Sequence, residues 1–302
     1  MIENSPFTKI FQICAVVNDV EGTAQQFTSL GLGSFTRLPY NHKFTQTQYK
    51  GKTVDGGAII LATDVGGVEF ELIQPLDGQS AWHEFLEKRG EGLHHLSFLV
   101  DDIDKEEENL VRQGINVIQK GRHDNGGYSY FETDAIGGVV FELLQRTRKL
   151  ETGKVRAEDN PFAVLHQVAS VVEDVDKTID YYTSLGLGPF KKMKMELTQR
   201  WLRGTPVQPK PKLTMTQAGN VEFELIQPDE SLNVHREFLN QKGEGLHHLG
   251  FFLGEEIHDE IEKLVKKGAE KSQYGHGPSD VFAYFEPITG IVLEFLKRGP
   301  QD

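Results

Sequence analysis

Two strings of the sequence place carboxylates and imidazoles among apolar, strand-forming residues, and each string occurs twice. VEFELIQP spans residues 68–75 and again 221–228, while GEGLHHL spans residues 90–96 and again 243–249. Because Cys14 is the only cysteine, a bound metal would have to be held by His, Glu, Asp or Gln and not by a cysteine cluster. Such side chains on neighbouring strands are suitable ligands for a divalent metal.

A third string indicates that the whole chain is a tandem duplication. TSLGLG spans residues 28–33 and 183–188, so the offset between the copies is 188 − 33 = 155 here and 228 − 75 = 153 for the first string. Recurrence at a nearly constant offset predicts two similar domains in the 302 residues. We expect the domains at residues 1–147 (repeat one) and 161–302 (repeat two), with the polar segment 148–160 as their linker.

Composition limits the kinds of partner. The formal charge of −13 argues against a nucleic-acid-binding surface, which needs clustered Lys and Arg. The sequence has no apolar run of roughly 18 residues and no N-terminal signal pattern, so we expect no membrane partner and a cytoplasmic location. The expected partner is a small-molecule substrate, bound by a monomer of two domains or by a homodimer.

Hydrophobic periodicity in repeat one alternates between helix and strand. It predicts helices at 20–30, 81–88 and 104–113 and strands at 11–17, 58–63, 68–73, 94–100, 116–119, 128–133 and 139–144. We interpret this order as βαβββ, a short helix, and βαβββ again, with one strand of the first module outside the ranges given. This order predicts an α+β fold for each repeat.

Side-chain alternation along these strands selects the polar residues that face away from the core. In the strand 94–100, His94 shares the apolar face with Leu96, whereas His95 and Ser97 point to the other side. Glu71 likewise lies opposite the apolar residues of the strand 68–73. We therefore expect His95 and Glu71 to face a cavity. The matching residues of repeat two are His248 and Glu224.

Polar residues also interrupt other apolar strands. Glu142 stands within VVFELL and Glu294 within IVLEFL, near the end of each repeat. Burying an unpaired carboxylate costs several kcal/mol, so each of these residues needs a partner. Gln12 and Gln167 interrupt the first apolar strand of each repeat in the same way.

Taken in order, these residues resemble the ligand set of the vicinal oxygen chelate superfamily, which includes glyoxalase I, methylmalonyl-CoA epimerase, extradiol dioxygenases and fosfomycin-resistance proteins. The resemblance covers nearly all of both repeats and implies tandem domains of paired βαβββ modules, each curved into a half-barrel cleft. The implied metal ligands are Gln12, Glu71, His95 and Glu142 in repeat one and Gln167, Glu224, His248 and Glu294 in repeat two. The LGLG and GLHHL strings resemble the epimerase branch, whereas the order Gln, Glu, His, Glu resembles glyoxalase I.

The implied ligands determine the chemistry that we expect. An amide oxygen, an imidazole and two carboxylates suit Zn²⁺, Ni²⁺, Co²⁺, Mn²⁺ or Fe²⁺ and leave two adjacent positions for a substrate with vicinal oxygens. A Lewis-acidic metal would stabilise an enediolate formed by proton removal next to a carbonyl. We therefore expect a glyoxalase- or epimerase-like isomerase or lyase. The resemblance implies that Glu142 or Glu294, and also Glu71 or Glu224, serves as the base.

Two other functions stay open. An extradiol-type Fe(II) dioxygenase would use two His and one Glu, but Gln12 and Gln167 stand at the first His position. A non-catalytic, resistance-type protein of this superfamily would sequester a small molecule without a metal. That function predicts broken ligand sets, whereas both sets are complete here.

Several further polar residues lie near the expected clefts. Glu196 matches Asn41 of repeat one, so it is a candidate second base in repeat two alone. His123 and His276, expected in loops, are either proton relays or exposed loop residues. His166 is out of phase with the cavity face, and we expect it to be structural. Basic residues look too sparse in the clefts to assign glutathione or coenzyme A.

Overall fold

The computed structural model describes residues 5–38, 47–123, 126–147, 151–155 and 160–299. The helices of repeat one are α1 (Val20–Leu30), α2 (Ala81–Arg89) and α3 (Ile103–Arg112). Its strands are β1 (Ile10–Val16), β2 (Thr36–Arg37), β3 (Gln48–Tyr49), β4 (Lys52–Thr53), β5 (Ala58–Asp64), β6 (Glu69–Pro75), β7 (Gly92–Leu99), β8 (Val117–His123), β9 (Gly126–Phe131), β10 (Val140–Arg146) and β11 (Gly153–Lys154).

Repeat two has the same sequence of elements, except that its described residues include no counterpart of β11, which follows repeat one. Its helices are α4 (Val175–Ser184), α5 (Val234–Lys242) and α6 (Ile257–Lys266). Its strands are β12 (Gln167–Val171), β13 (Lys191–Met193), β14 (Gln199–Leu202), β15 (Thr205–Pro206), β16 (Lys212–Ala218), β17 (Val221–Gln227), β18 (Gly245–Phe252), β19 (Lys271–His276), β20 (Val281–Phe285) and β21 (Val292–Lys297).

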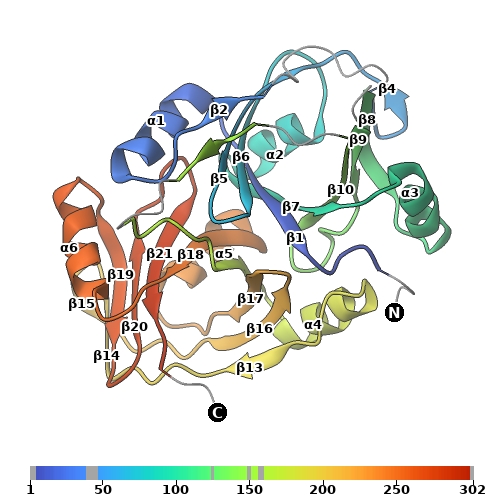
Figure 1. The fold of residues 1–302 in the computed structure, drawn as a ribbon. Helices are drawn as coiled ribbons and strands as arrows, with labels where there is room; N and C mark the ends of the chain where they lie inside the picture. Colours follow the sequence, from blue (N-terminus) through green and yellow to red (C-terminus); the bar gives the residue numbers. More distant parts are fainter. Residues whose placement is uncertain (1–4, 39–46, 124–125, 148–150, 156–159, 300–302) are drawn as a thin grey trace.

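The strands form two separate curved sheets, one in each repeat (Figure 1). The first has the order β11-β5-β6-β1-β7-β10-β9-β8-β3-β4, with β2 on β5. The second has the order β13-β16-β17-β12-β18-β21-β20-β19-β14-β15. In each sheet two βαβββ modules meet along an antiparallel pair, β1 with β7 or β12 with β18. The prediction of two tandem α+β half-barrels is therefore confirmed.

Helix α1 shows how local sequence sets an element. Its N-cap, Asp19, accepts a hydrogen bond from the backbone N–H of Gly22, and its C-cap, Gly31, has a φ of 111°, where a side chain would be strained. The residues Val20, Thr23, Ala24, Phe27 and Leu30 recur at helical spacing and are buried. The observed bounds agree with the predicted helix 20–30.

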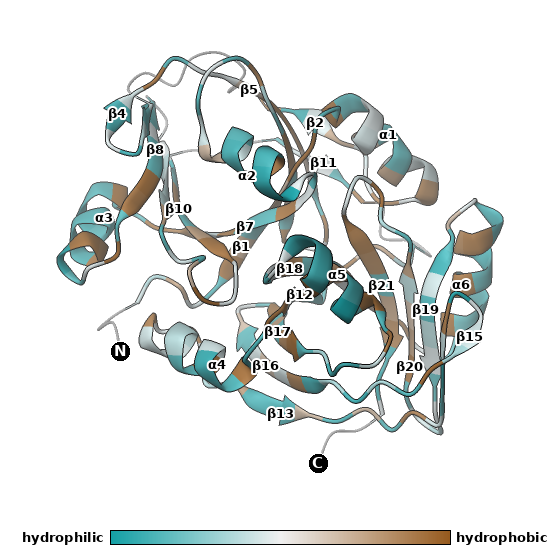
Figure 2. Ribbon diagram, turned by 180° about the vertical axis from the view of Figure 1, so that it is seen from behind, coloured by the Kyte–Doolittle hydropathy of each residue, from teal (hydrophilic) through white to brown (hydrophobic). Residues whose placement is uncertain are grey.

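The two repeats share one hydrophobic core on the sides of the sheets away from the clefts. Phe7 packs its ring 5.0 Å from that of Phe141, whose ring lies 5.4 Å from Tyr182 of α4. Figure 2 shows the hydrophobic strands inside and hydrophilic helix surfaces outside. Reciprocal contacts add to the interface, since Arg89 donates to the backbone carbonyl of Glu244 and Lys242 donates to that of Glu91.

Some short elements were not expected from periodicity. Strands β2, β3 and β4 have two residues each and follow α1, where the sequence has no alternating run. Strand β11 lies inside the expected linker 148–160 and pairs in parallel with β5, so this part of the linker extends the first sheet. The boundaries at 147 and 161 stay predictions. Across the described ranges, every helix is too short or too polar to cross a membrane.

Candidate metal centre

The candidate ligands of repeat one come from four adjacent strands, β6, β1, β7 and β10. Cys14 of β1 lies between Glu71 of β6 and His95 of β7 in the strand register. The ligand atoms of these three residues all lie within 4.8 Å of one another. Nε2 of His95 is also 3.2 Å from Oε2 of Glu142 on β10. The predicted ligands Glu71, His95 and Glu142 are buried, and so is Gln12 on β1. The sheet therefore brings the predicted residues to one place.

Hydrogen bonds tie two of the repeat-one candidates to their neighbours. The hydroxyl of Ser97 lies 2.7 Å from Oε1 of Gln12 and also contacts Oε2 of Glu142. The amide of Gln12 donates to Oε1 of Glu69 over 2.5 Å. Glu69 in turn accepts two hydrogen bonds from Arg146, of 2.8 and 2.7 Å. One oxygen of Gln12 and one of Glu142 are thus already engaged with the hydroxyl of Ser97.

The cavity beside this set is nearly filled. Its volume is about 40 Å³, and its lining includes Trp82, Tyr128 and Tyr130. Trp82 of α2 donates from Nε1 to the hydroxyl of Tyr130 over 3.2 Å and stacks on Tyr128 with ring centroids 6.2 Å apart. Ligand pockets usually have volumes of roughly 300–1,000 Å³. The repeat-one cavity therefore has room for water but not for an organic substrate.

In repeat two the four candidates converge in the same way around a glycine. Nε2 of His248 lies 3.1 Å from Oε2 of Glu294 and 3.9 Å from Oε2 of Glu224. Gly250 takes the place of Ser97 in the register. A Cβ atom added at Gly250 would lie 2.8 Å from Oε1 of Gln167 and 3.4 Å from Oε2 of Glu294. Both oxygens thus face Gly250, which has no hydroxyl, while the hydroxyl of Tyr284 is hydrogen-bonded to the side chain of Glu294.

A much larger cavity opens beside the repeat-two set. Its volume is about 280 Å³. Gln167, Glu224 and Glu294 line it at one side, and methionine, leucine and aromatic side chains line much of the rest. Its basic lining residues are Lys194, Arg200, Lys210 and Arg298. The expectation that basic residues are sparse in the clefts is therefore wrong for repeat two, because the segment before and after β14 folds over the cavity.

The buried imidazoles are the best test of whether a cation fits these sites. Within the described part of the chain, Nε2 of His95 and Nε2 of His248 are buried and make no hydrogen bond. A buried imidazole nitrogen without a partner is costly. Each of these atoms faces a carboxylate oxygen at 3.1–3.2 Å, and a shared cation would satisfy both groups. The donor set of imidazole, carboxylates and an amide oxygen thus fits a divalent metal ion.

Burial controls the electrostatics of both sites. It raises the pKa of Glu142 to about 8, although the hydrogen bond from Ser97 opposes this rise. Burial, followed by repulsion from Glu294, raises the pKa of Glu224 to about 8. Burial also lowers the pKa of His95 to about 3, so its imidazole is neutral and free to act as a ligand. A bound cation would favour the charged carboxylates and so lower the pKa of Glu142 and Glu224 again, and it would keep the imidazole of His95 neutral.

A β-bulge changes the expected direction of the first histidine in each HH pair. Cys14 pairs with His95, but the next residue, Ala15, pairs with Leu93, which leaves His94 as the extra residue. Nδ1 of His94 lies 2.8 Å from Nδ1 of His95, on the cleft side of the sheet. The expectation that His94 lies on the opposite face from His95 is therefore wrong, because side-chain alternation fails at a bulge.

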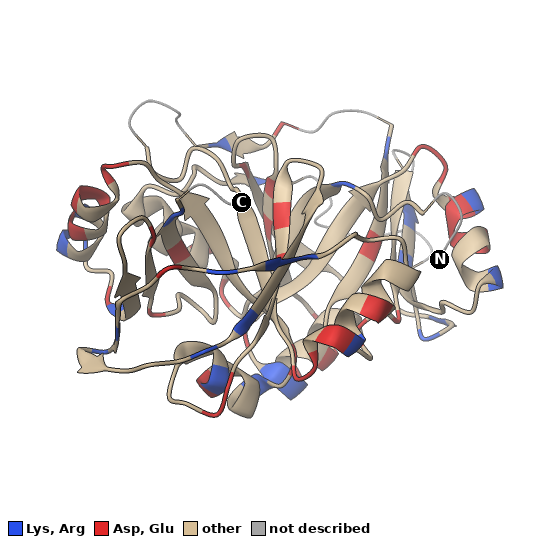
Figure 3. Cartoon of the chain, turned by 90° about the horizontal axis from the view of Figure 1, so that it is seen from below, with Lys and Arg blue, Asp and Glu red and all other residues tan. Residues whose placement is uncertain are grey.

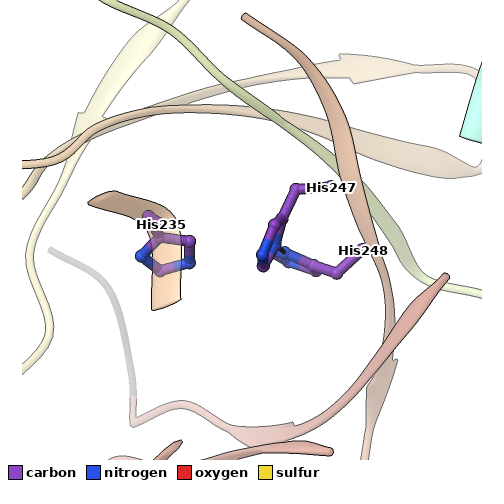
Figure 4. A group of neighbouring side chains, drawn as sticks. All are labelled: His235, His247 and His248. Atoms are coloured by element: carbon purple, nitrogen blue, oxygen red, sulfur yellow. Dashed lines mark hydrogen bonds between the residues drawn. The ribbon is translucent and has the colours of Figure 1, made fainter. Parts of the chain in front are cut away.

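Repeat two has a third histidine at this place. Figure 4 shows His235 of α5 facing His247 and His248. The ligand atoms of these three residues lie within 4.8 Å of one another, and Nε2 of His235 is buried without a hydrogen-bond partner in the described structure. Burial, followed by repulsion from His248, lowers the pKa of His235 to about 3. Trp82 occupies the matching position of α2 in repeat one.

The remaining candidates do not join the ligand sets. Glu196 is exposed and lines a surface hollow with Asp280, which accepts a hydrogen bond from its backbone N–H. It does not line the cavity beside the repeat-two set, so its position does not support a role as a second base. Its expected counterpart, Asn41, lies outside the described residues. His166 is structural as expected: it stacks on Phe252 and accepts a hydrogen bond from the Phe252 backbone.

The two expected loop histidines lie at strand ends. His123 ends β8 and lines the small repeat-one cavity. His276 ends β19 and stacks on Trp201, with ring centroids 5.6 Å apart. Their expected loop location is wrong, because β8 continues past the predicted strand end at residue 119 and β19 of repeat two likewise extends to His276. Only His123 is near a candidate ligand set.

Trp82 and His235 were not predicted from the sequence as residues of the clefts. Both lie at the second position of a short helix, in AWHEFL and VHREFL, where the Glu-Phe-Leu that follows is identical. The signal was therefore available as a difference between two otherwise similar segments. This difference could not be interpreted from the sequence, because the sequence does not show that this helix faces the cleft.

Comparisons with known proteins agree with this architecture. The model of the family described as the Glyoxalase/Bleomycin resistance protein/Dioxygenase superfamily matches residues 11–131 and again 166–285. A curated relative, the uncharacterized protein YqjC of Bacillus subtilis (strain 168), is 42% identical over 83 residues, which cover 26% of this chain and 59% of that protein.

Two solved structures share the fold over nearly the whole chain. A triple-mutant 4-hydroxymandelate synthase from Streptomyces coelicolor has a TM-score of 0.62 at 15% identity and covers 98% of this chain and 94% of its own. A Mn(II)-bound glyoxalase from Novosphingobium aromaticivorans has a TM-score of 0.52 at 14% identity and covers 97% of this chain and 82% of its own. With the family model matched in both repeats, the chain belongs to the Glyoxalase/Bleomycin resistance protein/Dioxygenase superfamily.

Proposed function

We propose that repeat two is a divalent-metal-dependent enzyme site that catalyses proton transfer next to a carbonyl, as an isomerase or lyase. The observation that carries this proposal is the unsatisfied Nε2 of His248, buried between Glu294 and Glu224 beside a cavity of about 280 Å³. A cation there would satisfy the imidazole and the carboxylates together. The Mn(II)-bound glyoxalase that shares this fold supports the choice of a divalent ion.

The position of each residue in repeat two determines whether we assign it to metal binding or to proton transfer. Gln167, His248 and Glu294 would hold the ion, with Glu224 as a further ligand. When bound, the ion supplies Lewis-acid stabilisation of negative charge on the oxygens of the substrate. Glu224 is the carboxylate farther from His248, at 3.9 Å, and it lines the cavity. We assign it as the base that removes the proton next to the carbonyl and returns it to the product.

Incubation of candidate substrates in deuterated water tests the reaction class. We expect Mn²⁺-dependent exchange at the carbon next to the carbonyl for one or more of 2-oxo acids, hydroxyketones, hemithioacetals and acyl thioesters, measured by proton NMR. Absence of exchange across all four classes, with the metal bound, would contradict proton-transfer chemistry.

Two isosteric variants separate metal binding from proton transfer. At saturating metal, Glu224→Gln should lower exchange by at least about a hundredfold, as expected for loss of a general base. Glu294→Gln should instead weaken metal binding, because it removes the carboxylate nearest His248. If Glu224→Gln keeps full exchange activity, the assignment of the base is wrong.

One observation favours a second function, that of an Fe(II) dioxygenase. His235 and His248 have ligand atoms within 4.8 Å of each other, so repeat two offers a second imidazole although Gln167 stands at the usual His position. Two imidazoles and a carboxylate are a common Fe(II) ligand set. Oxygen uptake by the Fe²⁺-loaded protein on catechols or 2-oxo acids, lost in His235→Gln, would select this function over proton transfer.

A further inference from the structure

The repeat-two cavity has an unusual charge for this acidic protein. Beside the two candidate ligands Glu224 and Glu294, all the described charged residues that line it are basic: Lys194, Arg200, Lys210 and Arg298. The chain as a whole has a formal charge of −13. In the view from below, Figure 3 shows basic residues along the strands at the front, whereas the helices carry many of the acidic ones. The cavity is therefore a local concentration of positive charge.

Three of these cations are not neutralised by the protein. Arg298 donates to Glu222 over 2.9 Å, as Arg146 does to Glu69 in repeat one, so this residue has a structural partner in both repeats. Within the described ranges, the ion pairs near the cavity involve Arg203, Arg236 and Arg298, and none involves the side chains of Lys194, Arg200 or Lys210. Three positive charges thus face one small cavity without a carboxylate partner.

Arg200 is the most informative of the three. It is half-buried on β14, and desolvation lowers its pKa without an opposing carboxylate. The strand register identifies the residue of repeat one that matches Arg200. Leu202, two residues after Arg200, pairs with Gln273, and Tyr49 pairs with the matching Gln119 in repeat one. The counterpart of Arg200 is therefore Thr47, which lies two residues before Tyr49 and is uncharged and buried. A guanidinium that is partly removed from water needs an anion to bind, and repeat one has no cation at this position.

The region between the cations and the metal-ligand set is apolar. Met193, Leu213 and Phe282 line the cavity together with other hydrophobic side chains. A ligand that reached from the carboxylates to Arg200 would therefore have a hydrophobic middle. The cavity volume of about 280 Å³, at the lower end for ligand pockets, limits that ligand to a small molecule.

We propose that repeat two takes a small organic anion, with two vicinal oxygens at the metal-ligand set, an apolar body, and a carboxylate or phosphate held by Arg200 with Lys194 and Lys210. This inference rests on the proposed function, which places the vicinal oxygens at the metal. It adds the charge and the shape of the substrate. A guanidinium binds either anion in a planar, bidentate manner, and the two lysines add unspecific attraction.

A matched pair of chelating probes tests the inference. 3,4-Dihydroxybenzoate and its methyl ester both present two vicinal oxygens on an apolar ring, but only the acid has an anion at the far end. Calorimetry on the Mn²⁺-loaded full chain should show the acid binding about tenfold more tightly or better, as expected for charge-assisted hydrogen bonds. Arg200→Gln should remove this preference, whereas Arg200→Lys should keep part of it.

A control variant and a metal titration separate the possible failures. Lys192→Gln removes a nearby exposed charge that does not line this cavity, and it should leave the preference unchanged. A first titration with Mn²⁺ alone reports on the metal site. If Mn²⁺ does not bind but the acid is still preferred through Arg200, the metal proposal fails and the anion inference stands. The anion inference is overturned if Mn²⁺ binds and the acid and the ester then bind equally. It is also overturned if neither probe binds.

Discussion

The two clefts of this molecule share a ligand set but differ at key positions around it. Repeat one has Ser97 and Trp82 where repeat two has Gly250 and His235. The first cavity measures about 40 Å³ and the second about 280 Å³. Four ligand-type residues in register therefore do not fix the size of the cleft beside them, which depends on neighbours such as Trp82 and His235. The proposal of a working site in repeat two rests on that open cleft.

The largest expected effect concerns the two equivalent histidines. His248→Ala should lower turnover of the substrate found by deuterium exchange by about a thousandfold, because it removes the only imidazole of the repeat-two ligand quartet. His95→Ala should change turnover by less than about twofold, since the small cavity beside it does not admit a substrate. Steady-state kinetics at saturating Mn²⁺ compares them. Equal losses would show that both sites work.

The second prediction uses stability to compare the helix residues that face the clefts. Trp82→Ala should lower the free energy of unfolding by about 3 kcal/mol or more, because a buried indole is lost from a packed cluster with Tyr128 and Tyr130. His235→Ala should cost about 1 kcal/mol or less, since His235 borders an open cavity and its Nε2 makes no hydrogen bond in the described structure. Urea unfolding curves measure both. A larger loss for His235→Ala would contradict this account of the packing.

Gly250 and Ser97 occupy the same position in the two ligand sets. Replacing each by the residue of the other repeat should change the affinity for Mn²⁺ by about tenfold. Gly250→Ser places a side chain against Gln167 and Glu294, within 2.8 Å and 3.4 Å for the Cβ atom alone, so it should weaken Mn²⁺ binding. Ser97→Gly removes the hydroxyl that contacts Gln12 and Glu142, so it should strengthen binding in repeat one. Mn²⁺ titration of the two variants checks both directions. A change of the same sign in the two would contradict the role given to Ser97.

The smallest expected effect is on stability and concerns Glu84, which lies outside the two ligand sets. The difference in stability between Glu84→Gln and wild type should depend on pH. Lys50 and Lys88 hold the pKa of Glu84 at about 2, below its usual value of 4.5. A lowered folded-state pKa stabilises the fold above pH 4.5, and this stabilisation is lost as pH falls from about 4.5 towards about 2. Because the pair is near the surface, Glu84→Gln should cost less than about 1 kcal/mol at pH 7. The difference between the melting temperatures of wild type and variant should be constant above about pH 5 and shrink as the pH falls from about 4.5 towards about 2; a difference that stays constant throughout would exclude this ion pair as its cause.

Much of the fold could be predicted from the sequence, because long periodic segments carry their own signals. The helix 20–30 has capping residues at both ends and a buried face, and its bounds agree with α1. The strands that carry the ligand candidates were recognised from apolar runs interrupted by Gln or Glu. The two-residue strands β2, β3 and β4 have no such pattern, since two residues cannot show alternation.

The candidate sites were only partly predictable. Strand alternation correctly placed His95 on the cleft side, but the bulge that turns His94 to the same side depends on pairing with β1. Glu196 was a candidate base because it is a carboxylate that follows the first helix of repeat two. In the structure it lies at the surface beyond β13, where its backbone N–H donates a hydrogen bond to Asp280. Cavity size could not be predicted, because it follows from tertiary packing, such as that of Trp82 against the tyrosines of β9.

The most direct test of the account is a calorimetric titration of chelator-treated protein with Mn²⁺, for wild type, His95→Ala and His248→Ala. The account predicts a tight site in wild type that persists in His95→Ala and disappears in His248→Ala, while any second site is weaker. Wild-type protein without a Mn²⁺ site, or a tight site that is lost in His95→Ala and kept in His248→Ala, would contradict the claim that repeat two holds the working metal centre.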